Sequence, residues 1–316
     1  MNKLNVALLS GGISSERDVS IKGGDQVFEA LDKTKYDVTR YDPKYDLARL
    51  VADATGIDIA LIILHGPYGE DGTVQGLLDL LGVPYQGSGV LGSALAMNKL
   101  LTKQIYEKSG IPTPPYLAVK KTDQLDPEAY VKALGLPLFV KPVIGGSSIG
   151  MSIVKSQENI KEAIALAFEN DDTVLIESYV KGIELTGGVL GNDDLVSLPI
   201  VEIIPDNEYE YFNYEAKYTP GATQEICPAR IDNTITEKAM EYSKIAHRAL
   251  CCSDYSRTDM ILQGDDIFVL ETNTIPGMTE TSLIPLAAKA AGFSFSGLLD
   301  KLIELSMERN GSRRFL

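Results

Sequence analysis

The chain has 316 residues, 44% hydrophobic and 23% charged, which is ordinary for a globular protein long enough for two or three domains. Its net charge of −15 argues against a nucleic-acid partner, because phosphate backbones require an excess of Lys and Arg. No run approaches the roughly 20 apolar residues of a membrane span, and the three cysteines lack zinc spacing, so we expect a cytoplasmic protein with no membrane partner.

Strand and helix patterns alternate along residues 1–97, which predicts a first domain of α/β type. Such alternation favours a parallel sheet covered by helices on both faces. The Pro-rich segment 111–115 indicates a boundary or a rigid connector. The expected strands are 6–9, 36–41 and 59–64, and the expected helices are 20–31 and 76–81.

Residues 98–182 are predicted to form a small antiparallel α+β domain, and residues 183–316 a larger α+β domain. The central domain should contain strands 138–141, 150–154 and 174–177 and helix 159–170. The last domain should contain long strands, a polar loop over 205–228, helix 236–250, a hairpin and a closing helix from 295.

The hairpin is predicted from two β-prone runs that flank Gly264-Asp265-Asp266. A three-residue loop centred on Asp265 would place Asp259 opposite Glu271 and Arg257 opposite Asn273, all on one sheet face. Carboxylate and amide oxygens suit Mg²⁺, and a neighbouring guanidinium suits an oxyanion or a phosphate. The alternative is a surface hairpin with cross-strand ion pairs, which is less favoured because two facing acids repel without a cation.

Phosphate-binding chemistry is suggested by the glycine-rich loop that follows Lys141 and contains Ser147 and Ser148. Backbone N–H groups and hydroxyls can approach an anion there, although an ordinary hairpin loop is the alternative. Lys99 and Lys103 lie one helical turn apart. Lys99 is expected at the same phosphate site, whereas Lys103 is expected on a solvated face.

Loops after two strands of the first domain carry further candidates. Glu16 could hold a substrate ammonium, although Ser15 and Asp18 could simply cap the helix that follows. His65 is expected to orient Glu16 rather than to react. Glu184, after the connector that begins near Glu177, could hold a ribose, although a rim carboxylate is the alternative.

Two later segments are also expected at a site. The Tyr-rich stretch 211–218 is typical of a lid, with Lys217 and Tyr218 at its tip. Residues 276–283 open a helix whose free N–H groups suit a carboxylate or phosphate, and Ser282 adds a hydroxyl.

Together these motifs resemble the D-alanine–D-alanine ligase family of ATP-grasp enzymes. The resemblance runs in order from about residue 5 to about residue 305, and it comprises Gly11-Gly12…Ser15-Glu16-Arg17, His65-Gly66…Gly69-Glu70-Asp71-Gly72, Met97-Asn98-Lys99, Lys141-Pro142…Gly146-Ser147-Ser148, Glu215-Ala216-Lys217-Tyr218 and Arg257-Thr258-Asp259…Glu271-Thr272-Asn273…Pro276-Gly277-Met278. Asn98 stands where the family commonly has Asp, and Ile144 and Gly145 stand where relatives often carry polar side chains.

The resemblance implies an ATP-grasp fold and a role for each matching residue. The first D-alanine and the oxyanion would be bound by Glu16, Arg257 and Gly277, with Ser147 and Tyr218 closing the lid over Glu16. His65, Ser282 and Leu283 would complete the substrate site. ATP would be bound by Lys99, Lys141, Ser148, Glu177, Tyr179, Val180, Glu184, Tyr211 and Lys217. Asp259, Glu271 and Asn273 would hold two Mg²⁺ or Mn²⁺.

The activity implied by the resemblance is ATP-dependent joining of two D-alanines through an acyl phosphate, for peptidoglycan precursors, by a homodimer. The alternatives are a D-alanine–D-lactate or D-alanine–D-serine ligase, or an ATP-binding regulatory module without turnover. Tyr218 at the lid tip, where a His would otherwise stand, resembles the dipeptide-forming type.

Overall fold

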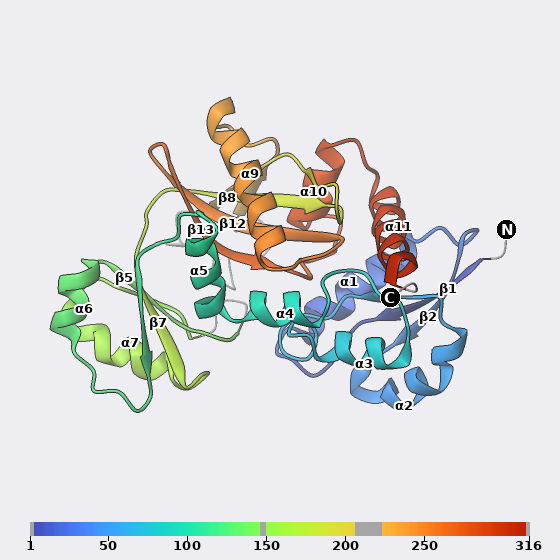
Figure 1. Cartoon of the computed structure of the whole chain (residues 1–316), viewed down its shortest axis with the longest axis horizontal. Helices are drawn as coiled ribbons and strands as arrows, with labels where there is room; N and C mark the ends of the chain where they lie inside the picture. Colours follow the sequence, from blue (N-terminus) through green and yellow to red (C-terminus); the bar gives the residue numbers. More distant parts are fainter. Residues whose placement is uncertain (1–2, 146–149, 206–222, 314–316) are drawn as a thin grey trace.

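The computed structural model describes residues 3–145, 150–205 and 223–313, with side chains as far as residue 309. Within these ranges the strands form three sheets, and each is packed against its own helices (Figure 1). The family-implied fold, one parallel α/β unit followed by two antiparallel α+β units, agrees with these sheets.

The first sheet is parallel, with strand order β2-β1-β3. Residues alternate between its faces: Val6 and Leu8 pack in the cluster that includes α1, whereas Ala7 and Leu9 pack in the cluster that includes α2 and α3. The predicted covering of both faces is therefore confirmed. The elements are β1 (Leu4–Leu9), α1 (Arg17–Ala30), β2 (Tyr36–Tyr41), α2 (Pro43–Asp53), β3 (Ile59–Ile62) and α3 (Thr73–Leu81).

The second sheet is antiparallel throughout, with order β4-β7-β5-β6, as expected for the central unit. Helices α4 (Val90–Met97) and α5 (Lys99–Lys108) lead into it from the first sheet. Ile160 and Ile164 of α7 pack against Val140 and Ile176 of the strands. Its elements are β4 (Tyr116–Lys120), α6 (Pro127–Leu134), β5 (Leu138–Pro142), β6 (Ser152–Val154), α7 (Ile160–Ala167) and β7 (Thr173–Ser178).

The third sheet is antiparallel, with order β11-β10-β8-β12-β13 and β9 paired to β8. Helix α9 covers one face, where Ala246 packs in the same cluster as Met260 and Val269. The predicted polar loop 205–228 is wrong at its end, because 223–226 form an edge strand beside β10. The elements are β8 (Ile183–Leu190), β9 (Val196–Ser197), β10 (Val201–Pro205), β11 (Thr223–Ile226), α9 (Asn233–Ala249), β12 (Tyr255–Gln263), β13 (Asp266–Asn273), α10 (Leu283–Ala290) and α11 (Phe295–Arg313).

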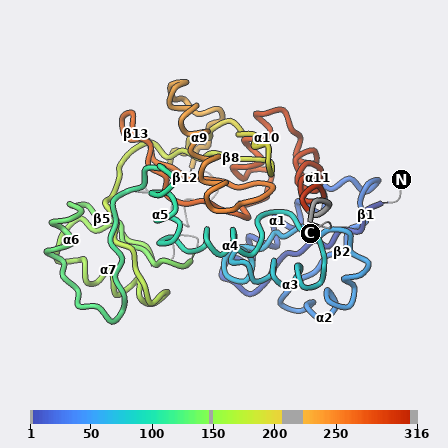
Figure 2. Tube along the Cα trace, in the orientation of Figure 1, coloured from blue at the N-terminus to red at the C-terminus, as the bar shows by residue number. Residues whose placement is uncertain are grey.

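The closing helix α11 returns to the first sheet, where it lies beside α1 (Figure 2). Leu298 and Leu302 pack in one cluster with Leu8 and Leu61. The first and third sheets thus share a hydrophobic core. The domain boundaries at 97/98 and 182/183 stay predictions.

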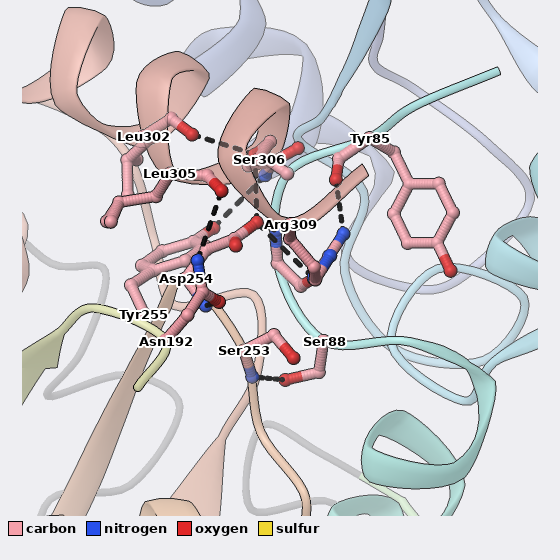
Figure 3. Close-up of polar contacts among 12 residues, drawn as sticks. Tyr85, Ser88, Asn192, Ser253, Asp254, Tyr255, Leu302, Leu305, Ser306 and Arg309 are labelled. Atoms are coloured by element: carbon pink, nitrogen blue, oxygen red, sulfur yellow. Dashed lines mark hydrogen bonds and ion pairs between the residues drawn. The ribbon is translucent and has the colours of Figure 1, made fainter. Parts of the chain in front are cut away.

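A buried polar network joins α11 to the start of β12 and to the loop after α3 (Figure 3). Asp254 is fully buried; its Oδ2 accepts hydrogen bonds from the Gly87 amide and the Ser306 hydroxyl, both at 2.8 Å, and lies 3.4 Å from Nη1 of Arg309. Arg309 also donates from Nη2 to the carbonyl of Tyr85 at 2.7 Å. Three distant segments are therefore fixed at one buried carboxylate.

Candidate active site

The β12–β13 hairpin places the polar residues as predicted, but by a different route. Asp259 pairs with Glu271 and Arg257 with Asn273, which confirms the predicted register. The loop has two residues, Gly264 and Asp265, because Gln263 pairs with Asp266. A β-bulge then inserts Leu270 between the residues facing Met260 and Asp259. The three-residue loop is wrong, and the bulge supplies the missing shift of one residue.

Asp259 is the centre of the polar face. Arg257 donates from Nε and Nη2 to its two carboxylate oxygens at 2.9 and 2.7 Å. Asn273 donates from Nδ2 to Oδ2 at 3.2 Å. From the neighbouring strand β8, Thr186 donates its hydroxyl to Oδ1. The guanidinium therefore balances the Asp259 charge.

The donor set on this face fits a divalent cation of the Mg²⁺ type. Asp259, Glu271 and Asn273 supply carboxylate and amide oxygens, and such sites usually take remaining ligands from phosphates and water. Groups of three or more His, Cys, Asp or Glu in metal-binding range do not occur in the described part of the chain. A cation on Asp259 would have to replace the present contacts of Arg257.

A cavity of about 760 Å³ brings the hairpin together with the first sheet and with α10. Glu16 and His65 line it from loops that follow β1 and β3. The site residues predicted from the sequence that line this cavity are Glu16, His65, Lys99, Arg257, Glu271, Asn273, Gly277, Ser282 and Leu283. Residues from four separate regions of the sequence, around 16, 65 and 99 and over 257–283, therefore face one space.

Glu16 and His65 are both 7% exposed. Burial opposes protonation of His65, but a hydrogen bond with Glu70 and the negative charges of Glu70 and Glu16 raise its pKa above the usual value. The Ser15–Asp18 capping alternative is wrong: Glu16 is the N-cap residue of α1, which has no side-chain cap hydrogen bond. Whether His65 orients Glu16 stays a prediction.

Lys99 lies at the start of α5, beside the glycine-rich loop. Its ammonium donates to the carbonyl of Gly145 and lies 4.0 Å from a carboxylate oxygen of Glu271. Asn98 caps this helix, accepting a hydrogen bond from the Leu101 amide at 3.0 Å. Asn is as good an N-cap as Asp, so this departure from the family pattern preserves the cap.

Three charged side chains meet where strands β5 and β7 of the second sheet approach α5. Glu177 lies 2.8 Å from the ammonium of Lys141 and 3.2 Å from that of Lys103. Burial would raise the pKa of Glu177, but the two lysines hold it below its usual value. The predicted solvated position of Lys103 is wrong, because the residue is completely buried.

Sequence reasoning missed several polar residues beside the site, among them Lys103 and Thr186. A signal for Lys103 existed: it shares a helix face with Tyr106, an aromatic residue at i+3 that is also buried. Nothing in the sequence alone pairs Thr186 with Asp259, because their contact requires β8 to lie beside β12.

Other predicted residues lie apart from the cavity lining or outside the described residues. Tyr179 and Val180 connect β7 to β8, and Glu184 lies on β8. With Lys141 and Glu177, they are not among the residues that line the cavity. Ser147, Ser148, Tyr211, Lys217 and Tyr218 lie outside the described residues.

The segment before α10 is held by its own hydroxyls. Ser282 is the N-cap residue of α10, and its Oγ accepts a hydrogen bond from the Thr279 amide at 3.1 Å. A Cβ on Gly277 would lie 3.0 Å from the same Oγ, so a side chain there would crowd Ser282.

Among the described residues, no helix is both long and apolar enough to cross a membrane.

Comparisons with known proteins show the family of this chain. A family model described as "D-ala D-ala ligase C-terminus" matches residues 105–304, and one described as "D-ala D-ala ligase N-terminus" matches residues 44–88. The D-alanine–D-alanine ligase of Syntrophobacter fumaroxidans is 62% identical over 97% of this chain and 98% of its own length, and that of Desulfotalea psychrophila is 50% identical over 99% and 98%.

Solved structures are similar over nearly the whole chain. The D-alanine–D-alanine ligase of Bacillus anthracis complexed with ATP has a TM-score of 0.86 and 37% identity, covering 98% of this chain and 99% of its own. The VanG D-Ala:D-Ser ligase of Enterococcus faecalis has a TM-score of 0.84 and 32% identity, covering 96% and 100%. The chain therefore belongs to the D-alanine–D-alanine ligase family of ATP-grasp enzymes.

Proposed function

We propose that the protein joins two D-alanines with ATP, giving D-alanyl-D-alanine, ADP and phosphate, in the cytoplasmic synthesis of peptidoglycan precursors. One observation carries the proposal: Glu16 and His65 line the same cavity as Arg257, Glu271 and Asn273. A carboxylate for an amino group, a guanidinium for an oxyanion and oxygen ligands for cations are the groups that a carboxylate–amine ligation requires.

The first step makes a poor electrophile reactive. A carboxylate does not lose oxide, so the first D-alanine attacks the γ-phosphate of ATP; a new O–P bond forms, ADP leaves, and an acyl phosphate results. Glu16 holds the ammonium of this D-alanine, and the positive charges of Lys99 and Lys141 offset the phosphate charge. Two Mg²⁺ or Mn²⁺ held by Asp259, Glu271 and Asn273 would neutralise the transferring phosphoryl group.

The second step forms the peptide bond. The amine of the second D-alanine attacks the acyl carbon, a tetrahedral oxyanion forms, and phosphate leaves with the C–O bond electrons while the amine loses a proton. Arg257 and the Gly277 amide stabilise the oxyanion. Ser282, with Leu283 beside it, binds the second carboxylate at the start of α10.

The remaining assignments concern the nucleotide and the assembly. Glu177, Tyr179 and Val180 are assigned to adenine and Glu184 to the ribose. Ser147, Ser148, Tyr211, Lys217 and Tyr218 are assigned to the phosphates and the lid. A homodimer is expected.

D-alanine is favoured as the second substrate over D-serine or D-lactate. The relatives at 62% and 50% identity are D-alanine–D-alanine ligases, whereas the D-Ala:D-Ser ligase is 32% identical. A regulatory module without turnover would not require Arg257, Asp259 and Glu271 to be kept together on one face.

The test is phosphate release from ATP with Mg²⁺ or Mn²⁺, screened over D-alanine, D-serine and D-lactate, with the product identified by mass spectrometry. We expect release that depends on D-alanine and a product of the dipeptide mass. Phosphate release that requires D-lactate or D-serine in addition to D-alanine would show that the second substrate is that compound and not D-alanine. ATP binding without D-alanine-dependent release would remove the ligase function.

A further inference from the structure

The buried cluster beneath the second sheet contains two cations and one anion. Glu177 of β7 lies between Lys141 of β5 and Lys103 of α5, at 2.8 and 3.2 Å from their ammonium groups. These three residues are 2%, 5% and 0% exposed in that order. A buried charge is costly unless an opposite charge compensates it, and here the single carboxylate of Glu177 compensates both ammonium groups.

Lys103 has contacts that fix its ammonium on the protein side of the cluster. It donates to Thr113 Oγ1 at 2.6 Å, and it lies 5.4 Å from the centre of the Tyr116 ring. Lys103 is completely buried, so it presents no surface to a ligand. Lys103 therefore acts on the site through Glu177.

The charge balance of the cluster shows how Lys103 affects Lys141. With both lysines protonated and Glu177 ionised, the cluster carries one net positive charge. Without Lys103, Glu177 would pair with Lys141 alone, and the positive charge of Lys141 would be cancelled. A phosphate-binding lysine is useful only while its charge remains available to the phosphate.

We propose that Lys103 is a positioning residue of the nucleotide site, which holds Glu177 from inside the protein and so leaves the positive charge of Lys141 available to the phosphates of ATP. This inference rests on the proposed use of ATP and goes beyond it by assigning a role to a residue that touches no substrate.

A pH signature follows from the surroundings of Lys103. Burial lowers its pKa to about 8, although the opposite charge of Glu177 counteracts that shift, Lys141 reinforces it, and Glu107 on the same helix opposes it. Tyr116 presents its ring face to the ammonium. As the pH rises through about 8, Lys103 loses its charge, and affinity for ATP should fall.

The decisive measurement is calorimetric binding of a non-hydrolysable ATP analogue with Mg²⁺, compared between wild type, Lys103→Met and Lys108→Met. Lys108 is an exposed lysine near the end of the same helix and serves as the matched control. We expect Lys103→Met to weaken binding roughly tenfold, while its kcat at saturating ATP and its KM for D-alanine change less than about twofold. Equal binding by Lys103→Met and Lys108→Met would overturn the proposal.

The pH profile separates positioning from mere support of the fold. Wild-type affinity should fall between pH 7 and pH 9, and the Lys103→Met profile should be flat. If Lys103→Met does not fold, the wild-type profile alone decides, and a flat one overturns the inference. Wild type that binds the analogue with this pH dependence but releases no D-alanine-dependent phosphate would uphold Lys103 and remove the proposed ligase reaction.

Discussion

At the scale of single residues, Arg257 has two possible partners that exclude each other. It now donates two hydrogen bonds to Asp259, and it also lines the cavity where the oxyanion should form. We expect Arg257→Ala to lower kcat by roughly 10²–10³, the usual loss for one oxyanion donor. Arg248→Ala, at an exposed position of α9, is the control and should keep wild-type turnover in the phosphate-release assay. Near-native activity of Arg257→Ala would remove the residue from catalysis.

His247 gives the stability of the protein a pH dependence. It lies on α9, where Nδ1 is 2.8 Å from the hydroxyl of Ser256 on β12, and burial lowers its pKa to about 4. Below pH 6.5 the unfolded chain binds a proton at this residue that the native chain does not. The stability therefore decreases as the pH is lowered from 6.5 to about 4. Between pH 7 and pH 5 this amounts to about 2 kcal/mol.

Urea denaturation at pH 7 and pH 5 tests this expectation in wild type and in His247→Gln. The variant should lose about 2 kcal/mol less than wild type over the interval, because Gln does not titrate. The second histidine, His65, is present in both proteins, so its contribution cancels in the comparison. Parallel stability curves would show that His247 is not the residue responsible.

At the scale of elements, the hairpin shows what the sequence can and cannot predict. The β-prone runs around Gly264 determine the centre of the hairpin, and that centre is enough to align Asp259 with Glu271. It does not determine the loop length, because a two-residue loop with a bulge at Leu270 gives the same alignment as a three-residue loop. The pairing was therefore predictable, whereas the backbone path was not.

Contacts between elements explain the other differences. Helical spacing places Lys103 on one face with Lys99, but only the position of β7 decides that this face meets Glu177 and not water. The edge strand β11 follows a stretch with no clear alternation, so it was included in the predicted loop. The alternating pattern of residues 1–97, in contrast, is local, and its parallel sheet was predicted correctly.

The hairpin loop itself gives a clean test of backbone conformation. Gly264 has φ of +61°, and a Cβ there would meet no atom within 4 Å. Gly264→Ala should therefore cost only the backbone penalty of the left-handed region, about 1 kcal/mol of unfolding free energy. Gly56→Ala is the matched control: a Cβ there also meets nothing, and its φ is not positive, so stability should stay the same or rise slightly. Equal unfolding midpoints for the two variants would contradict this account.

At the scale of the whole molecule, the first and third sheets are fixed to each other by α11. Its apolar face completes the shared core, and Arg309 meets Asp254 beside the start of β12 (Figure 3). β12 carries Arg257 and Asp259 only a few residues later, so this junction lies next to the polar face of the hairpin along the chain.

Arg309→Met should destabilise the protein by about 3–5 kcal/mol, because it leaves the carboxylate of Asp254 buried without its cation. Burial already raises the pKa of Asp254, with Arg309 opposing that shift, so the variant raises it further. A carboxyl with a raised native pKa loses stability as pH rises from its unfolded pKa toward the native one, so the deficit of Arg309→Met should be smaller at pH 5 than at pH 7. Urea denaturation at the two pH values measures both effects.

The pair Asp254→Asn with Arg309→Met should recover part of the loss, since the amide can still accept from Gly87 without carrying a charge. A double variant no more stable than Arg309→Met would mean that Arg309 acts through its packing and its bond to Tyr85 rather than through the charge of Asp254.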